Sequence, residues 1–248
     1  MAFNAIYTSM ASLETSTQKL DTIAQNLANT NTEGYASVQT NAVALSYRGD
    51  SAIPGADVVS VGENADTQAG SFKHTGSPFD VAVKGGWLVA QTPGGRTGLT
   101  RNGSLAISST GLLTTASGDL VLGSNGTPIS LPQLKSLTVS SNGEISGIAA
   151  ASTTNSPQVF GRLMLASTPA SGSLVPMGNT LYGLPAGQTK PTVAANAQVE
   201  QGYLEDSNVN SVKSMIDLIS TQRGYSLDTQ VVTTSSQTAS ALNQVLMA

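Results

Sequence analysis

The side chains that could carry out nucleophilic, redox or metal chemistry are few in this sequence. The 248 residues include no cysteine and one histidine, His74. Disulfides, thiolate nucleophiles, zinc fingers and iron–sulfur clusters are therefore excluded, and so is a site with several histidine ligands. His74 could serve a Ser-His-Asp triad, but the sequence has no G-x-S-x-G nucleophile elbow. A surface or turn position is the favoured interpretation of this histidine.

The acidic residues are dispersed, and Glu205-Asp206 is the one adjacent carboxylate pair. A glycosidase needs two placed carboxylates, but this pair lies just ahead of a predicted helix, where negative charge favours the helix dipole. Neither a G-x-G-x-x-G motif nor a P-loop occurs, and residues 94–98 are better explained as a hairpin loop. We therefore expect no active site, no metal and no cofactor.

The composition argues against two classes of partner. The formal net charge is −4, and the 11 Lys and Arg residues are scattered, so a nucleic-acid partner is not expected. Only 10% of residues are charged while 39% are hydrophobic, a balance typical of extracellular and filament-forming β proteins. No run of apolar residues is long enough to predict a membrane span. The start of the sequence, MAFNAIYTSM, does not look like a cleaved secretory signal.

Proline and glycine divide the chain into three parts. All 10 prolines lie between Pro54 and Pro191, and all 25 glycines lie between Gly34 and Gly224. Because these residues interrupt helices, the two ends are predicted to be long helices and the middle is predicted to be β. The boundaries that we expect are 1–35, a connecting segment over 36–70, a β domain over 71–204, and 205–248.

Both ends carry apolar or small residues at heptad spacing. In the N-terminal segment these are Ile6, Met10, Leu13, Thr17, Leu20, Ala24 and Leu27. In the C-terminal segment, with one stutter, they are Val212, Ile216, Ile219, Arg223, Leu227, Val231, Thr234, Thr238, Ala241 and Val245. Such stripes predict that the two helices form a coiled-coil pair. Because Thr and Ala weaken these seams, two alternatives stay open: an ordinary intramolecular pair, or ends that stay loose until they meet neighbouring subunits.

The middle of the chain predicts an irregular all-β domain. Residues 79–84 alternate in polarity, and Trp87 opens a second apolar run that follows a Gly-Gly turn. Turn dipeptides then recur every seven to eight residues, which is typical of a meander of hairpins. They are Asn102-Gly103, Thr110-Gly111, Ser117-Gly118 and Asn125-Gly126. Trp87 is expected to be the aromatic anchor of the core.

Residues 23–35, IAQNLANTNTEGY, carry a far more specific pattern. They resemble the N-terminal signature of the bacterial flagellar rod and hook proteins, A-x-N-L-A-N-x-x-T-x-G-[YF]. The positions kept are Asn26, Leu27, Ala28, Asn29, Thr32, Gly34 and Tyr35. Near the other end, LEDSNVN resembles the family's S-N-V-N motif through Asn208, Val209 and Asn210. Arg223 and Tyr225 match an R-x-[YF] triplet, although Gly224 departs from the larger residue usual at its centre.

The resemblance extends through the middle. Residues 78–83, Trp87, residues 99–104 and residues 130–132 are similar to the core shared by rod and hook proteins. The opening residues 5–8, the short connection after Tyr35 and the Gly-Gly-Trp sequence favour the proximal-rod type. The distal-rod type is the nearest alternative.

The resemblance implies a structural subunit of the flagellar basal-body rod, which lies in the periplasm and is not an enzyme. It implies helical assembly with copies of itself and with other rod subunits, and passage through the flagellar type III export apparatus without a cleaved signal. The signature residues, together with Asn208, Val209, Asn210, Arg223 and Tyr225, would then be assembly residues. A secreted surface adhesin and a secreted hydrolase are the alternatives from other classes.

Elementary chemistry gives the signature a simpler meaning as well. Asn26 and Asn29 are three residues apart near a predicted helix end, where their amides can bond free carbonyls or an adjoining helix. Gly34 permits a left-handed turn after the helix. A helix C-terminus with a polar cap is therefore the alternative to an assembly element.

Overall fold

The computed structural model describes residues 2–46, 56–152, 156–169, 173–185 and 187–246. They form two compact units. The first, here called the helical unit, comprises Met1–Ala28, Val38–Asn64 and Asn210–Ala248. The second, here called the β unit, comprises Asn29–Ser37 and Ala65–Val209.

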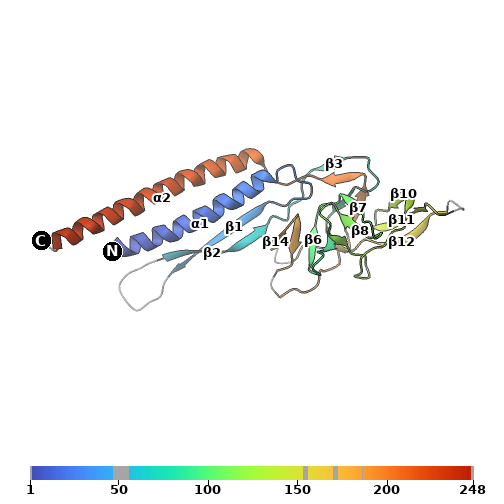
Figure 1. Cartoon of the computed structure of the whole chain (residues 1–248), viewed down its shortest axis with the longest axis horizontal. Helices are drawn as coiled ribbons and strands as arrows, with labels where there is room; N and C mark the ends of the chain where they lie inside the picture. Colours follow the sequence, from blue (N-terminus) through green and yellow to red (C-terminus); the bar gives the residue numbers. More distant parts are fainter. Residues whose placement is uncertain (1, 47–55, 153–155, 170–172, 186, 247–248) are drawn as a thin grey trace. The chain divides into compact units, whose positions relative to one another are not determined.

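The helical unit contains the two long helices predicted from the breaker-free ends. Helix α1 spans Ala2–Ala28 and helix α2 spans Ser211–Leu246. They run side by side in opposite directions, so that both chain ends lie at the same end of the unit (Figure 1). Strands β1 (Val38–Ser46) and β2 (Ala56–Ala65) pair with each other. The stretch 36–70, expected to be a connecting segment, thus holds a two-stranded sheet.

The predicted coiled-coil pair is wrong. A coiled coil buries its a and d side chains, but on α2 the apolar residues of the predicted seam are about half exposed or more: Val212 66%, Ile216 61%, Ile219 50%, Leu227 61% and Val231 49%. On α1, Met10 is 55% exposed. The side chains of Ile6 and Val245 lie outside the described residues. The heptad spacing is present, but it does not mark the face through which the two helices meet.

The partly buried side of α2 carries mostly small or polar residues, together with Leu218 and Val232. Ser214, Thr221, Gly224 and Asp228 are all less exposed than the apolar stripe. The Ser12 hydroxyl of α1 donates a hydrogen bond of 2.8 Å to the Asp228 carboxylate. Short side chains let two helices approach without interlocking knobs, and this explains why the pairing does not follow the apolar heptads.

Antiparallel sheets make up the β unit. The largest has eight strands: its path runs β14 (Val175–Gly178), β15 (Leu181–Gly183), β6 (Thr97–Thr100), β5 (Trp87–Gln91), β9 (Leu120–Val121), β8 (Leu113–Thr115) and β7 (Leu105–Ile107), and β13 (Leu165–Ala166) also pairs with β5. A three-stranded sheet has the order β10 (Leu134–Val139), β11 (Glu144–Ala149) and β12 (Gln158–Arg162). Two short ladders pair β16 (Gln198–Gln201) with β4 (Val81–Lys84) and β17 (Tyr203–Glu205) with β3 (Phe72–His74).

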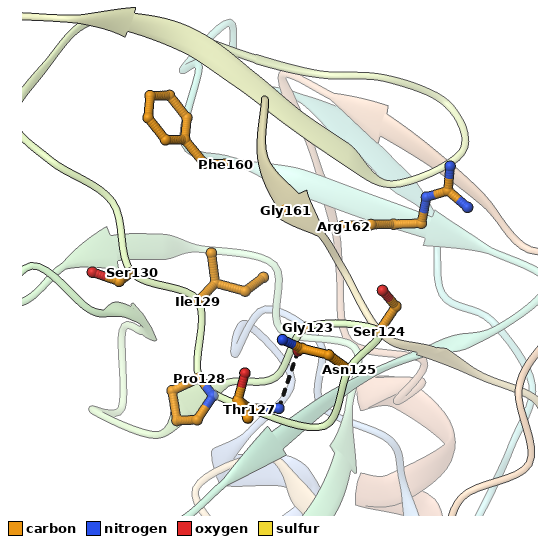
Figure 2. Close-up of a pocket in the computed structure, with 10 residues that line it drawn as sticks. All are labelled: Gly123, Ser124, Asn125, Thr127, Pro128, Ile129, Ser130, Phe160, Gly161 and Arg162. Atoms are coloured by element: carbon orange, nitrogen blue, oxygen red, sulfur yellow. Dashed lines mark hydrogen bonds between the residues drawn. The ribbon is translucent and has the colours of Figure 1, made fainter. Parts of the chain in front are cut away.

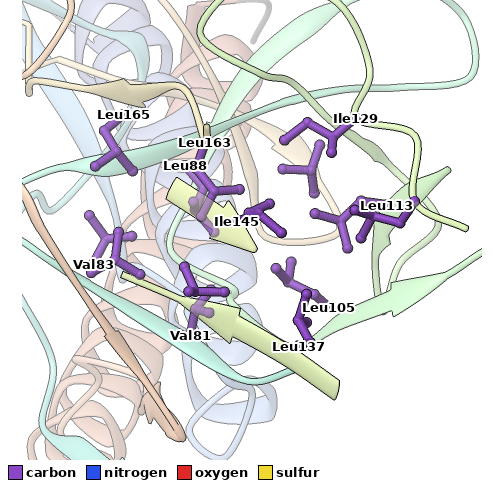
Figure 3. Close-up of a cluster of buried hydrophobic side chains, with 14 residues drawn as sticks. Val81, Val83, Leu88, Leu105, Leu113, Ile129, Leu137, Ile145, Leu163 and Leu165 are labelled. Carbon is purple, nitrogen blue, oxygen red and sulfur yellow. The ribbon is translucent and has the colours of Figure 1, made fainter. Parts of the chain in front are cut away.

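Two hydrophobic clusters form the core of the β unit. The larger brings together side chains from several sheets, including Val81, Leu88, Leu113, Ile145 and Leu163 (Figure 3). The second cluster surrounds Trp87, which is completely buried, as expected from the sequence. Ala36, just after the N-terminal signature, belongs to the second cluster.

Candidate functional site at the junction of the terminal segments

The segment that follows α1 and the segment that precedes α2 lie side by side in the β unit. We call residues 29–37 and 205–209 together the junction. The Gly34 amide donates to the Glu205 carbonyl at 2.7 Å, and the Asn208 amide donates to the Tyr35 carbonyl at 3.3 Å. The Asn208 side chain accepts a bond of 2.7 Å from the Ser37 amide. The junction therefore joins the N-terminal signature to the S-N-V-N motif, 171 residues later in the chain.

Gly34 satisfies two geometric requirements of the junction. Its φ of +67° lies in the left-handed region, which confirms the predicted turn. A Cβ at this position would lie 2.1 Å from the backbone nitrogen of Asn102. Glycine is thus required both by the conformation and by the close approach of the two backbones.

The two signature asparagines make different contacts. Asn26, within the helical unit, donates to the Val38 carbonyl at 2.7 Å and accepts from the Val38 amide at 2.8 Å, so its buried amide acts as a strand partner. Asn29 accepts a hydrogen bond of 3.0 Å from the Thr32 hydroxyl and helps to close the turn before Gly34. Leu27 is half-buried and Ala28 is exposed.

Tyr182 holds the backbone of Ala36 at the end of the signature. Its hydroxyl accepts from the Ala36 amide at 2.7 Å and donates to the Ala36 carbonyl at 3.1 Å. Burial raises the pKa of Tyr182 above its ordinary value, so the phenol keeps the proton that it donates. The ring packs edge-on against Trp87, with centroids 5.7 Å apart. The Tyr182 side chain, from strand β15 of the large sheet, therefore makes the two hydrogen bonds with the Ala36 backbone that a neighbouring strand would otherwise make.

One residue of the junction, Glu205, forms a buried ion pair with Arg101. Arg101 and Glu205 are 2.8 Å apart, and their side chains are only 8% and 2% exposed. Arg101 also donates to the carbonyls of Gln68 and Thr67, at 2.8 and 2.6 Å, and its guanidinium lies 4.2 Å from the centre of the Trp87 ring. Glu205 accepts from the Gly70 amide at 2.9 Å.

The position of Glu205 corrects the sequence-based interpretation of the Glu205-Asp206 pair. Glu205 belongs to β17 and is buried against Arg101, so it does not serve the helix dipole. Burial raises the pKa of its carboxyl group, and the Arg101 charge and the Gly70 amide act in the opposite direction. The N-terminus of α2 is capped instead by Asn210, whose side chain accepts a bond of 3.0 Å from the Lys213 amide.

The structure brings together some of the predicted site residues and separates others. Gly34, Tyr35 and Asn208 meet in the junction, and the Asn208 amide group also donates to the Gln68 carbonyl at 2.9 Å. Val209 is half-buried beside them. Arg223 and Tyr225 are exposed on α2 and take no part in the junction.

Sequence reasoning gave no role to Arg101 or Tyr182. Arg101 stood inside residues 99–104, a motif similar to that of rod and hook proteins, and as the one charged residue of this motif it was a usable signal. Tyr182 carried no comparable signal, because its partner Ala36 is 146 residues away.

A pocket of about 260 Å³ opens between β12 and the hairpin over residues 123–130 (Figure 2). Its lining includes the hydroxyl-bearing Ser124, Thr127 and Ser130, with Phe160 and Arg162 on β12. Arg162 is the one ionisable side chain among the lining residues. Because acid–base catalysis needs a proton donor and acceptor of suitable pKa, this lining does not form a catalytic pair.

Known proteins match the chain along its length. The profile described as "Flagella basal body rod protein" matches residues 6–35, that of "Flagellar hook protein FlgE/F/G D1 domain" matches 82–147, and that of "Flagellar basal body rod FlgEFG protein C-terminal" matches 200–245. The flagellar basal-body rod protein FlgF of Escherichia coli is 34% identical over 98% of this chain and 98% of its own length. This chain belongs to the flagellar basal-body rod family. It is a structural subunit of the rod in the flagellar basal body.

Further relatives bear on the type of rod protein. FlgF of Salmonella typhimurium is 33% identical, again over 98% of both chains. The rod protein FlgG of Agrobacterium fabrum is 30% identical over 92% of this chain and 93% of its own length. The resemblance to the rod family, and to its FlgF type, is thereby confirmed. Within the described residues, neither helix of this rod protein is long and apolar enough to cross a membrane.

Proposed function

We propose that this rod subunit builds the proximal rod by offering the apolar stripe of α2 to neighbouring subunits, and that it has no enzymatic activity. The stripe consists of Val212, Ile216, Ile219, Leu227 and Val231, each 49–66% exposed. This exposure is the observation that carries the proposal. Contiguous exposed apolar surface on a protein generally indicates an interaction site.

Burial of the stripe in an assembly is expected to lower the free energy of the subunits. Burying a Val, Leu or Ile side chain fully contributes roughly 1.5–3 kcal/mol. Several such side chains on one helix would offset much of the entropy lost when subunits associate. Because few charged side chains lie among the stripe residues, little charge has to be desolvated on contact. Head-to-tail contacts of this kind build a helical shaft.

The signature and S-N-V-N residues have a second role in this proposal. Gly34, Tyr35 and Asn208 hold the segments next to both helices in one place, while Asn26 ties α1 to β1. Leu27, Ala28, Asn29, Thr32, Val209 and Asn210 belong to the same segments. Arg223, which lies between Ile219 and Leu227 on the line of the stripe, and Tyr225 are both exposed and available to a neighbouring subunit.

The partners that we propose are other copies of this chain, the remaining proximal- and distal-rod subunits and the flagellar type III export apparatus. Passage through an export channel requires an unfolded chain. Both buried hydrophobic clusters of the described residues lie in the β unit, and this supports the route, because the pairing of α1 with α2 then provides less hydrophobic stabilisation to be overcome.

The alternative of a secreted hydrolase has little support. Glu205, one half of the adjacent carboxylate pair, is 2% exposed and bound to Arg101, which leaves it unable to reach a glycan. Incubation of the purified chain with purified peptidoglycan should release no soluble fragments. A distal-rod role is the remaining alternative within the family.

The deciding experiment follows rod assembly in a strain that lacks this chain. Assembly should stop before the hook, and the wild-type gene should restore it. A variant with Ile216→Ser and Ile219→Ser should fail to restore it, whereas the matched exposed-polar variant Gln222→Ser and Gln230→Ser should succeed. Normal hooks in the deletion strain would overturn the proximal-rod assignment, and full rescue by the stripe variant would overturn the role of the stripe.

A further inference from the structure

The ion pair between Arg101 and Glu205 has a large desolvation cost relative to what it contributes to stability. Both charges are withdrawn from water, and Arg101 Nε and Glu205 Oε2 are buried without a hydrogen-bond partner among the described residues. Buried pairs with incomplete hydrogen bonding are often less stabilising than apolar side chains of similar volume. The best-attested role of such groups is to specify one register among several.

The pairing register of β17, the strand that carries Glu205, has to be specified. Among the strands that the structure describes, β17 forms its ladder with β3, in three residue pairs: Tyr203 with His74, Leu204 with Lys73, and Glu205 with Phe72. Backbone bonds at Gly202 and Asp206 continue the pairing on either side, and a buried charged pair adds a side-chain contact that favours this one register. Leu204 is the one apolar side chain of β17 that is buried.

A competing register is available one residue away. Asp206 follows Glu205, and a shift of one residue would place a second carboxylate at the position facing Arg101. In the observed register Asp206 instead pairs with Ser71: its amide donates to the Ser71 carbonyl at 2.8 Å, and the Ser71 hydroxyl donates to its carboxylate at 3.1 Å. The longer glutamate reaches the guanidinium while Gly70 also binds it.

We propose that the Arg101–Glu205 pair is a register lock, in which Arg101 selects the residue of β17 that lies opposite Phe72. Arg101 is anchored independently of β17, through the carbonyls of Thr67 and Gln68 and the face of Trp87. It therefore presents a fixed charge that only one register of β17 satisfies with Glu205. The register in turn fixes where Asn208 meets Ser37 and Tyr35 in the junction.

Engineered disulfides can read the register directly, because the natural chain has no cysteine. His74→Cys with Tyr203→Cys reports the observed register, since these residues are opposite each other. Thr75→Cys with Tyr203→Cys reports the shifted one. In the otherwise unchanged full-length chain, the first pair should oxidise at least about tenfold faster than the second. In the variant Arg101→Met with Glu205→Leu, that ratio should fall by about tenfold while cooperative unfolding is retained.

The matched control removes an exposed pair by the same substitutions. Arg162→Met with Glu144→Leu breaks a surface pair, 3.7 Å apart, that touches neither β17 nor β3, and it should leave the ratio unchanged. If the apolar double variant does not fold, Glu205→Gln decides, because it keeps the size of the side chain but removes the charge that Arg101 selects and leaves Asp206 as the nearest carboxylate of the chain. An unchanged ratio in the folded double variant, or in Glu205→Gln when the double variant does not fold, overturns the lock. The readout uses purified chain, so it is independent of rod assembly.

Discussion

At the scale of single residues, two side chains each satisfy both backbone groups of another residue, one within the helical unit and one within the β unit. Asn26 pairs with both backbone groups of Val38, and Tyr182 pairs with both backbone groups of Ala36. Buried backbone groups without partners are costly, so each of these side chains is required where it stands. Gly34 contributes differently, through the absence of a side chain.

Substitution of Gly34 should therefore be more damaging than substitution of other left-handed glycines. Gly34→Ala combines left-handed strain with a clash against the Asn102 backbone, and we expect it to lower the free energy of unfolding by about 2–5 kcal/mol. Gly126→Ala is the matched control: its φ is +78°, but an added Cβ meets nothing within 4 Å. It should cost about 1–2 kcal/mol. Urea denaturation measures both, and equal losses would contradict the role of close approach.

Removal of the Tyr182 hydroxyl tests the second contact. Tyr182→Phe leaves the amide and carbonyl of Ala36 buried and unpaired, so we expect a loss of about 1–3 kcal/mol in the free energy of unfolding. Tyr225→Phe, on the exposed surface of α2, should stay within about 0.5 kcal/mol of the natural chain. Denaturant titration with hydrogen exchange at Ala36 provides the measurement. Unchanged protection of the Ala36 amide would show that the hydroxyl is dispensable.

At the scale of elements, the two helices differ from the sheets in how they are stabilised. The β unit has two clusters of buried apolar residues, whereas the partly buried side of α2 carries mostly small or polar residues with Leu218 and Val232. Because hydrophobic burial is the main stabilising contribution, the helices are expected to open at lower free energy than the sheets.

Limited proteolysis of the monomer should reveal that difference. Both ends should be removed first, leaving a fragment from about residue 40 to about residue 205, because segments that open easily are cut first. Mass spectrometry of the products identifies the boundaries. Ends that resist protease as well as the β unit does would contradict the expectation that they become fully ordered only in the assembly.

At the scale of the whole molecule, low charge and an exposed apolar stripe act together. With a net charge of −4 and a calculated pI near 4.8, only weak electrostatic repulsion keeps copies of the chain apart. That balance suits a subunit that has to remain monomeric before assembly and then pack closely against its neighbours.

Self-association should consequently depend on pH. The net charge is negative above the calculated pI of 4.8 and vanishes as the pH falls to it, so light scattering from the purified chain should rise as the pH is lowered from neutrality toward that value. The variant Ile216→Ser with Ile219→Ser should scatter less at the same pH, while Gln222→Ser with Gln230→Ser should behave like the natural chain. Equal scattering from the two variants would show that the stripe does not drive association.

The sequence by itself determined the two long helices, the β nature of the middle and the family. Because glycine and proline interrupt helices, their positions predicted α1 and α2, and Gly34 predicted a left-handed turn. The signature and the S-N-V-N motif identified the rod family. Local conformational preference and short motifs need no knowledge of distant contacts, and this is why these features could be read from the residues alone.

Only the tertiary structure decided which surfaces are buried and which residues meet. Heptad spacing marked an apolar stripe on α2 but could not tell whether α1 or solvent faces it, since periodicity describes one helix and not its partner. Glu205 was interpreted as a helix-terminal charge because Arg101, 104 residues away, is not its neighbour in sequence. Tyr182 and Ala36 are separated still further. Contacts between distant segments depend on how the sheets stack, and that stacking exists only in the folded chain.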